Sequence, residues 1–150
     1  MFILKKVYCR IFQKVFRIAL PLLPYREPEI LESIELIPET VKKNGCKKTI
    51  IVTDKGIINL GLIDSLVEAL KKSEIPFAIY DKTVPNPTTD NVAKAYDLYK
   101  KENCDCLIAF GGGSSMDCAK ATGAQLAYPK KTLGQLKGIL KVHKKLPLLI

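Results

Sequence analysis

Three consecutive glycines followed by a serine, Gly111, Gly112, Gly113 and Ser114, stand between a short apolar run and a segment of helical periodicity. Glycines permit positive φ and place no Cβ between the backbone and a diphosphate. A helix that begins beyond them points N–H groups and about half a positive charge at such a group. The alternative is a plain turn in which Ser114 caps the helix and Asp117 completes a capping box. That alternative explains Ser114 and Asp117 but not three glycines, so the pattern favours phosphate binding.

A carboxylate, Asp54, closes an earlier apolar run. At the end of a strand it can accept hydrogen bonds from both hydroxyls of an adenosine ribose. It would also repel a 2′-phosphate: two like charges about 5 Å apart, at an effective dielectric near 20, repel by roughly 3 kcal/mol before screening. Asp54 therefore predicts NAD rather than NADP. A turn or helix-cap aspartate is an equally good local interpretation.

Asn86 lies between Pro85 and Pro87, which restrict its backbone. Its amide is predicted either to contact the nucleotide or to close an Asx turn. The local pattern favours the turn.

The elements that must position these residues alternate along the chain. Apolar runs predict strands at 48–53, 77–80, 106–110 and 146–150, and helical periodicity predicts helices at 62–72, 88–99 and 114–128. Strands separated by helices pair in parallel through right-handed crossovers. The sequence predicts an α/β domain with a Rossmann-like, doubly wound parallel sheet. Because ligands of such sheets bind beyond the carboxyl ends of the strands, Asp54, Asn86 and Gly111–Ser114 should converge there.

We expect this nucleotide-binding domain to span residues 28–150, with Pro28–Leu36 as an extended piece beside the sheet. Residues 1–27 are predicted to form a basic amphipathic helix. Its charges interrupt any signal-peptide core or spanning segment. A transit peptide or a membrane-surface helix would share these features, but packing on the same protein or on a partner subunit is favoured.

The net charge of +9 belongs to the two ends of the chain. Residues 1–26 and 129–150 each carry six Lys or Arg and no acid, which leaves 12 basic and 15 acidic residues between them. We therefore expect no nucleic-acid and no membrane partner. The alternative is a basic protein that binds nucleic acid or an anionic membrane through its ends.

The five cysteines form no CxxC pair. We expect reduced thiols in a cytoplasmic setting, with no metal bound by cysteine. The final run, LPLLI, has the character of a core strand. Since a strand of this kind needs covering, we expect the domain to be incomplete at its C-terminus.

Three strings, IVTDKGI (51–57), DKTVPNPTTDNV (81–92) and FGGGSSMDCAK (110–120), resemble the iron-containing, or group III, alcohol dehydrogenase family. The resemblance covers residues 25–150. It implies a dehydroquinate synthase-like nucleotide-binding domain followed by a helical domain, with Fe²⁺ or Zn²⁺ in the cleft between them. The implied activity is an oxidoreductase acting on a small alcohol or aldehyde with NAD, as a homo-oligomer.

Site roles also follow from the resemblance. Asp54 matches the ribose-binding aspartate and Asn86 a nucleotide-contacting asparagine, while Gly112, Gly113 and Ser114 match the pyrophosphate turn, supported by Gly111 and Asp117. The family's metal ligands, one aspartate and three histidines, match nothing in this chain, whose one histidine is His143. The resemblance thus assigns no catalytic and no metal-binding residue here, and we expect the chain to be inactive alone. A non-catalytic nucleotide-binding module is the alternative.

Overall fold

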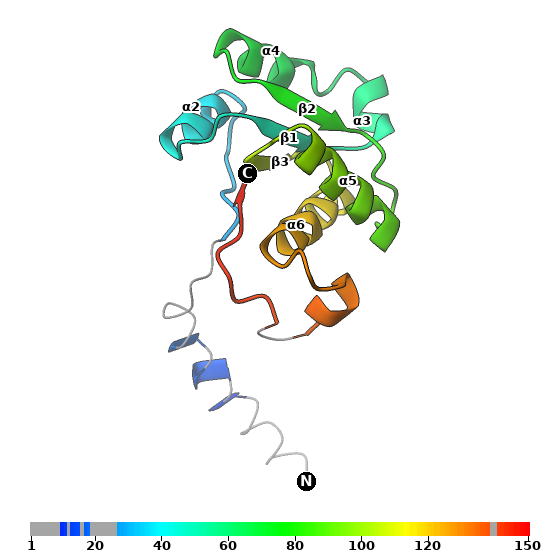
Figure 1. The fold of residues 1–150 in the computed structure, drawn as a ribbon. Coiled ribbons are helices and arrows are strands. Elements are labelled where there is room, and N and C mark those ends of the chain that lie inside the picture. Colours follow the sequence, from blue (N-terminus) through cyan, green and yellow to red (C-terminus); the bar gives the residue numbers. More distant parts are fainter. Residues whose placement is uncertain (1–9, 12, 16, 19–26, 139–140) are drawn as a thin grey trace.

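The computed structural model describes residues 10–11, 13–15, 17–18, 27–138 and 141–150 (Figure 1). Its centre is a parallel sheet in the order β2-β1-β3-β4. The strands are β1 (Thr49–Val52), β2 (Phe77–Tyr80), β3 (Cys106–Ala109) and β4 (Leu148–Leu149). All four lie within the runs predicted from sequence. The parallel pairing is confirmed.

Helices cover both faces of this sheet (Figure 1). They are α2 (Leu36–Lys43), α3 (Lys55–Asn59), α4 (Asp64–Lys72), α5 (Thr89–Lys101) and α6 (Gly113–Ala127), with a 3-10 turn, η2 (Leu133–Leu136). Buried residues of α5 and α6 pack on one face, and buried residues of α2 and α4 pack on the other. The doubly wound architecture predicted from the sequence is therefore confirmed.

The central strands are buried on both sides because their side chains alternate between two cores. Ile50 and Leu107 belong to the core beneath α5 and α6, whereas Ile51 and Ile108 belong to the core beneath α2 and α4. All four are at most 1% exposed. Truncating one of them to alanine would cost about 2–5 kcal/mol, so these strands form a rigid base for the loops at their ends.

Hydrogen bonds connect the start of α5 to the end of β2 and the residues that follow it. Thr88 and Asn91 form a capping box, which confirms the N-cap predicted for this helix. The Asn91 amide also donates to the Lys82 carbonyl at 2.8 Å and to the Tyr80 hydroxyl at 3.2 Å. These bonds hold the chain that follows β2 against α5.

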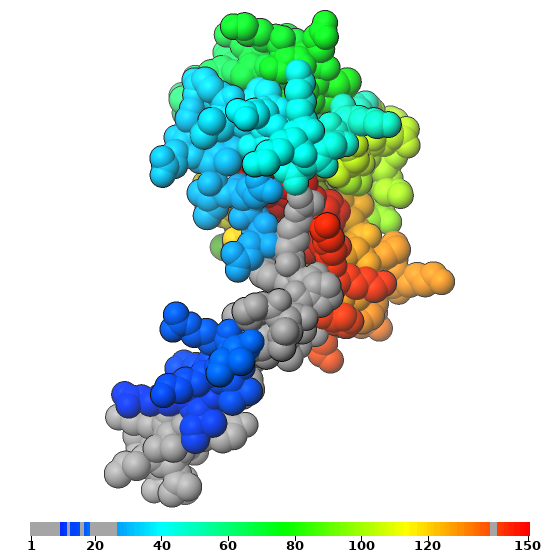
Figure 2. Space-filling view, turned by 90° about the vertical axis from the view of Figure 1, so that its left-hand side faces the viewer, coloured from blue at the N-terminus to red at the C-terminus, as the bar shows by residue number. Residues whose placement is uncertain are grey.

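Two helices were not predicted. Helix α3 is a single short turn begun by Asp54, and α2 begins at Leu36, where an extended piece was expected to end. Residues 27–31 do run beside β4, and the Glu29 N–H donates to the Leu149 carbonyl at 2.8 Å. Residues 27–31 and β4 lie on the face shown in Figure 2. Residues 27–31 form no strand beside β4, and Pro28 has no N–H to contribute to a ladder.

The described residues of the predicted N-terminal helix, at 10–11, 13–15 and 17–18, are helical and exposed. Ile11, Val15 and Ile18 expose 58%, 61% and 74% of their surface, so the described part of the chain does not cover the apolar side of this helix. The rest of residues 1–26 lies outside the described residues. Among the residues described, no helix has the length and apolar character needed to cross a membrane.

Candidate functional site

A cleft of about 630 Å³ opens at the carboxyl ends of β1, β2 and β3. Three loops line it, at 54–56, 81–85 and 112–114. They follow β1, β2 and β3 respectively, on the side of the sheet toward which the β2 arrow points in Figure 1. The size is that of a small-molecule or cofactor pocket. The structure thus brings together Asp54, Gly112, Gly113 and Ser114, as the sequence predicted.

Helix α6 starts at the cleft without a side-chain cap. Its N-cap is Gly112, Ser114 already lies inside the first turn, and no side-chain oxygen accepts a hydrogen bond from the helix start. The alternative in which Ser114 and Asp117 form a capping box is therefore wrong. Asp117 is exposed and does not line the cleft. The first-turn N–H groups of α6 remain donors at the cleft, together with the positive end of the helix dipole.

The three glycines differ in what a side chain would meet. Gly111 has φ +139°, and a Cβ there would lie 2.9 Å from Ser115 Oγ and 3.5 Å from Asp54 Oδ2. A Cβ on Gly112 or Gly113 would meet no atom within 4 Å. Gly111 therefore allows the turn itself, while Gly112 and Gly113 keep the floor of the cleft open above the helix start.

The two carboxylate oxygens of Asp54 have different surroundings. Its Oδ1 accepts a hydrogen bond from the Ile57 N–H at 3.1 Å and caps α3, so the helix-cap interpretation is confirmed. Its Oδ2 lies toward Gly111, within reach of the cleft. Because the two oxygens serve different sides, capping α3 does not compete with accepting hydrogen bonds from a ligand.

Asn86 stands at the rim of the cleft. It adopts φ 55°, a left-handed conformation that asparagine tolerates better than most residues, and its side chain is exposed. Its neighbour Pro85 lines the cleft, whereas Asn86 does not. The structure thus gives Asn86 a role in shaping the turn, and its contact with a nucleotide stays a prediction.

Three buried hydroxyls near the cleft have no hydrogen-bond partner among the described residues: Thr53, Thr83 and Ser115. Thr83 lines the cleft, Thr53 precedes Asp54, and Ser115 lies against Gly111. An unsatisfied buried hydroxyl costs about 1–3 kcal/mol, so this region is polar enough to receive further hydrogen bonds. Sequence reasoning missed all three, since buried threonine and serine carry no signal in residue type alone.

Charged side chains complete the lining. Asp54 and Asp81 face the cleft together with Lys55 and Lys82, two cations that sequence reasoning also missed. Only their positions in the sequence could have indicated that they line the cleft, because Lys55 directly follows Asp54 and Lys82 lies two residues beyond β2. A diphosphate would gain from these cations as well as from the α6 dipole.

The cleft does not fit the metal that the resemblance implies. Its lining offers two carboxylates and no imidazole or thiol. His143 lies elsewhere among the described residues, with its ring edge-on to Tyr128 at a centroid distance of 5.7 Å. These lining residues therefore support no catalytic step through a metal.

Comparisons with known proteins agree with this geometry. Alcohol dehydrogenase 4 of Schizosaccharomyces pombe is 43% identical over 110 residues, covering 73% of this chain and 26% of that protein. Choline dehydrogenase of Bacillus subtilis is 43% identical over 95 residues, covering 63% of this chain and 24% of that protein. The chain therefore spans about a quarter of the length of these curated relatives.

Solved structures of similar proteins share this fold. A 1,3-propanediol oxidoreductase superposes with a TM-score of 0.75 at 32% identity, covering 83% of this chain and 31% of that chain. An alcohol dehydrogenase from Oenococcus oeni gives a TM-score of 0.72 at 36% identity, covering 77% of this chain and 30% of that chain. The sequence pattern of the family described as iron-containing alcohol dehydrogenase matches residues 31–150. This chain belongs to the iron-containing alcohol dehydrogenase family.

Proposed function

We propose that this chain forms the NAD-binding part of a metal-dependent alcohol dehydrogenase. The observation that carries the proposal is the uncapped start of α6, which opens into the cleft beneath two glycines whose Cβ positions are empty space. Backbone N–H donors with no side chain above them suit the diphosphate of a dinucleotide. Bound NAD supplies a nicotinamide that accepts or returns the hydride of an alcohol or aldehyde.

In this proposal the diphosphate lies over Gly112 and Gly113, and the N–H groups of the first α6 turn donate to it. Asp54 Oδ2 accepts hydrogen bonds from the adenosine ribose hydroxyls. Lys55 and Lys82, which also line the cleft, offset the charge of the diphosphate. Asn86 contacts the nucleotide from the rim, while Gly111 and Asp117 support the shape of the turn.

Substituting Asp54 by asparagine should shift nucleotide preference toward NADP. Asparagine keeps an acceptor for the α3 cap but removes the charge that repels a 2′-phosphate. The repulsion of roughly 3 kcal/mol before screening corresponds to a change of about tenfold or more in the NADP-to-NAD affinity ratio. Calorimetric titrations of the chain with each nucleotide would measure that ratio.

Asp81→Asn is the matched control, because Asp81 also carries a carboxylate into the cleft but follows a different strand. Its affinity ratio should stay within about twofold of that of the parent chain. An Asp54→Asn ratio that also stays unchanged would show that Asp54 does not approach the ribose.

The substrate class that we propose is a small alcohol or aldehyde. Similar proteins are named for choline, methanol and 1,3-propanediol. By resemblance, Fe²⁺ or Zn²⁺ is held by residues in the part of those longer relatives that this chain does not span. We further propose a cytoplasmic homo-oligomer, which the reduced thiols of Cys104, Cys106 and Cys118 and the 93% exposed Ile30 support.

The 150-residue chain by itself should not turn over alcohols. Metal-assisted hydride transfer requires a cation fixed by several ligands with one position open to the substrate oxygen, and the cleft offers no such set among the described residues. Purified chain with NAD, simple alcohols and added Fe²⁺ or Zn²⁺ should show no absorbance increase from NADH. Metal-dependent turnover at the cleft would contradict this prediction.

A further inference from the structure

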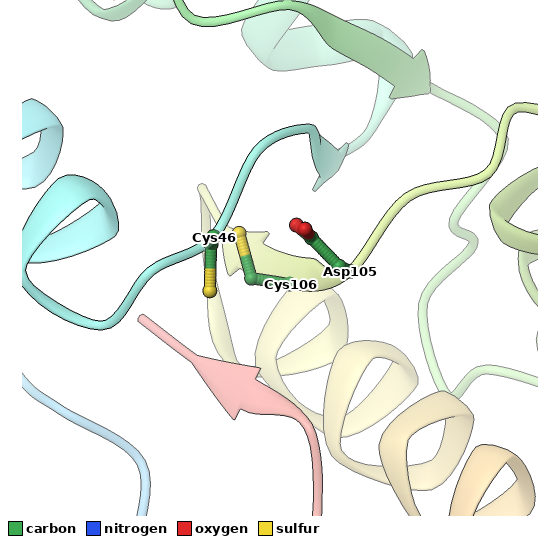
Figure 3. A group of neighbouring side chains, drawn as sticks. All are labelled: Cys46, Asp105 and Cys106. Atoms are coloured by element: carbon green, nitrogen blue, oxygen red, sulfur yellow. The ribbon is translucent and has the colours of Figure 1, made fainter.

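Three potential metal ligands lie close together at the amino ends of β1 and β3, whereas the cleft lies at the carboxyl ends of the strands. Cys46 lies between α2 and β1, Asp105 precedes β3, and Cys106 begins it. Their two sulfurs and a carboxylate oxygen lie within 4.8 Å of one another (Figure 3). Tetrahedral Zn²⁺ with bonds of about 2.0–2.3 Å needs donors separated by roughly 3.5–4 Å, so shifts of about 1 Å suffice.

The strand register creates this cluster. Thr49 of β1 pairs with Cys106 of β3, and the Asp105 N–H donates to the Lys48 carbonyl at 2.9 Å. Since the turn containing Cys46 runs directly into β1, the same pairing places it beside the start of β3. No short-spaced cysteine motif in the sequence signals this arrangement.

The carboxylate of Asp105 is already oriented. The Lys47 N–H donates to one of its oxygens at 2.7 Å, and the Lys48 N–H donates to the other at 3.1 Å. A carboxylate offers about four lone-pair sites, so each oxygen retains capacity for a metal. Backbone donors of this kind fix a ligand's direction and reduce what ordering it would cost on binding.

The two thiols of the cluster differ in their exposure to solvent. Cys106 is fully buried and packs in the core beneath α2 and α4, whereas Cys46 is partly exposed at the surface of that core. A thiol ligates as its thiolate, so Cys106 binds a cation with loss of its proton. A cation could enter past Cys46 and leave one coordination position toward solvent.

We propose that Cys46, Asp105 and Cys106 bind Zn²⁺, with water as the fourth ligand. Two thiolates and one carboxylate suit this borderline-soft cation and not Mg²⁺ or Ca²⁺, which require oxygen ligands. Both thiols lose a proton on binding, and no electron is transferred. The site stands at the amino ends of the strands, whereas the cleft is at their carboxyl ends, so it clamps the turn before β1 to β3 and takes no part in hydride transfer.

The test uses the reduced 150-residue chain and Cd²⁺, which reports thiolate coordination through a sulfur-to-metal absorption band. One equivalent of Cd²⁺ should bind, excess Zn²⁺ should compete for the same site, and Zn²⁺ added to the metal-free chain should raise the melting temperature. Cys46→Ala and Asp105→Asn should each lower the Cd²⁺ affinity by about 100-fold or more, beyond the range seen for loss of an outer-shell partner. Both positions are at least partly exposed, so these variants should fold.

Cys104→Ala is the matched control. Cys104 is buried on the opposite face of the sheet, in the core beneath α5 and α6, so this substitution should not change the Cd²⁺ affinity. The proposal is overturned if Cys46→Ala binds Cd²⁺ as tightly as the parent chain, or if Cys104→Ala abolishes binding. NAD titrations of the same variants should be unchanged, which separates this outcome from that of the cleft.

Discussion

Substituting Gly113 by valine is expected to weaken NAD binding by about 100-fold or more without unfolding the chain. Gly113 is the first residue of α6, and a Cβ there would enter open space at the cleft. The added methyl groups would separate the diphosphate from the N–H donors of the first turn. Losing two charge-assisted hydrogen bonds at about 1.5–3 kcal/mol each corresponds to that factor.

Calorimetric titration with NAD would measure the affinity, and a thermal melt would show whether the chain stays folded. Met116→Val is the control, because Met116 lies in the same helix, is 43% exposed and does not line the cleft. It should bind NAD as the parent chain does. Parent-like affinity in Gly113→Val would contradict phosphate binding, whereas loss of folding would indicate that Gly113 serves only the turn.

Substituting Gly111 by alanine is expected to destabilise the fold itself, by about 3 kcal/mol. At φ +139° an L-residue is strained, and its Cβ would lie 2.9 Å from Ser115 Oγ. Strain of this kind costs of order 1–3 kcal/mol, and forced overlap in a packed site adds about 1–3 kcal/mol. Urea unfolding monitored by circular dichroism would give the free energy of unfolding.

Gly112→Ala provides the comparison, since Gly112 has an extended backbone and an empty Cβ position. It should change the free energy of unfolding by less than about 1 kcal/mol. Adding Ser115→Ala to Gly111→Ala should restore part of the loss by removing the overlap while the backbone strain remains. Equal stabilities for Gly111→Ala and Gly112→Ala would refute this division of roles between neighbouring glycines.

The sequence alone determined the strands and the turn, because both depend on local patterns. The run before Asp54 is apolar and β-branched enough to be buried on both faces, and it became β1. The glycine run predicted the sharp passage from β3 into α6. Helix α2 was not predicted from the sequence, because Pro38 interrupts a short apolar stripe. Proline is nevertheless tolerated in a first helical turn.

Only the tertiary structure decided how the side chains divide their hydrogen bonds. One oxygen of Asp54 caps α3 while the other lies toward Gly111, so the helix-cap interpretation holds and ribose binding by the second oxygen stays a prediction. The capping box at Ser114 is wrong because the N-cap of α6 is Gly112, two residues earlier, and Ser114 lies inside the first turn. Lys82 and Thr83 line the cleft on a loop that Asn91 connects to α5 and that the Thr83 N–H connects to the Thr53 carbonyl.

The proximity of Cys46 and Cys106 is also decided by the tertiary structure. Neither residue carries a local signal for the other, and the register of β1 against β3 alone brings their sulfurs together. Local patterns specify which segments become strands and turns. Which side chains then share a site depends on contacts between distant segments, and those arise only when burial of apolar faces selects one pairing of the strands.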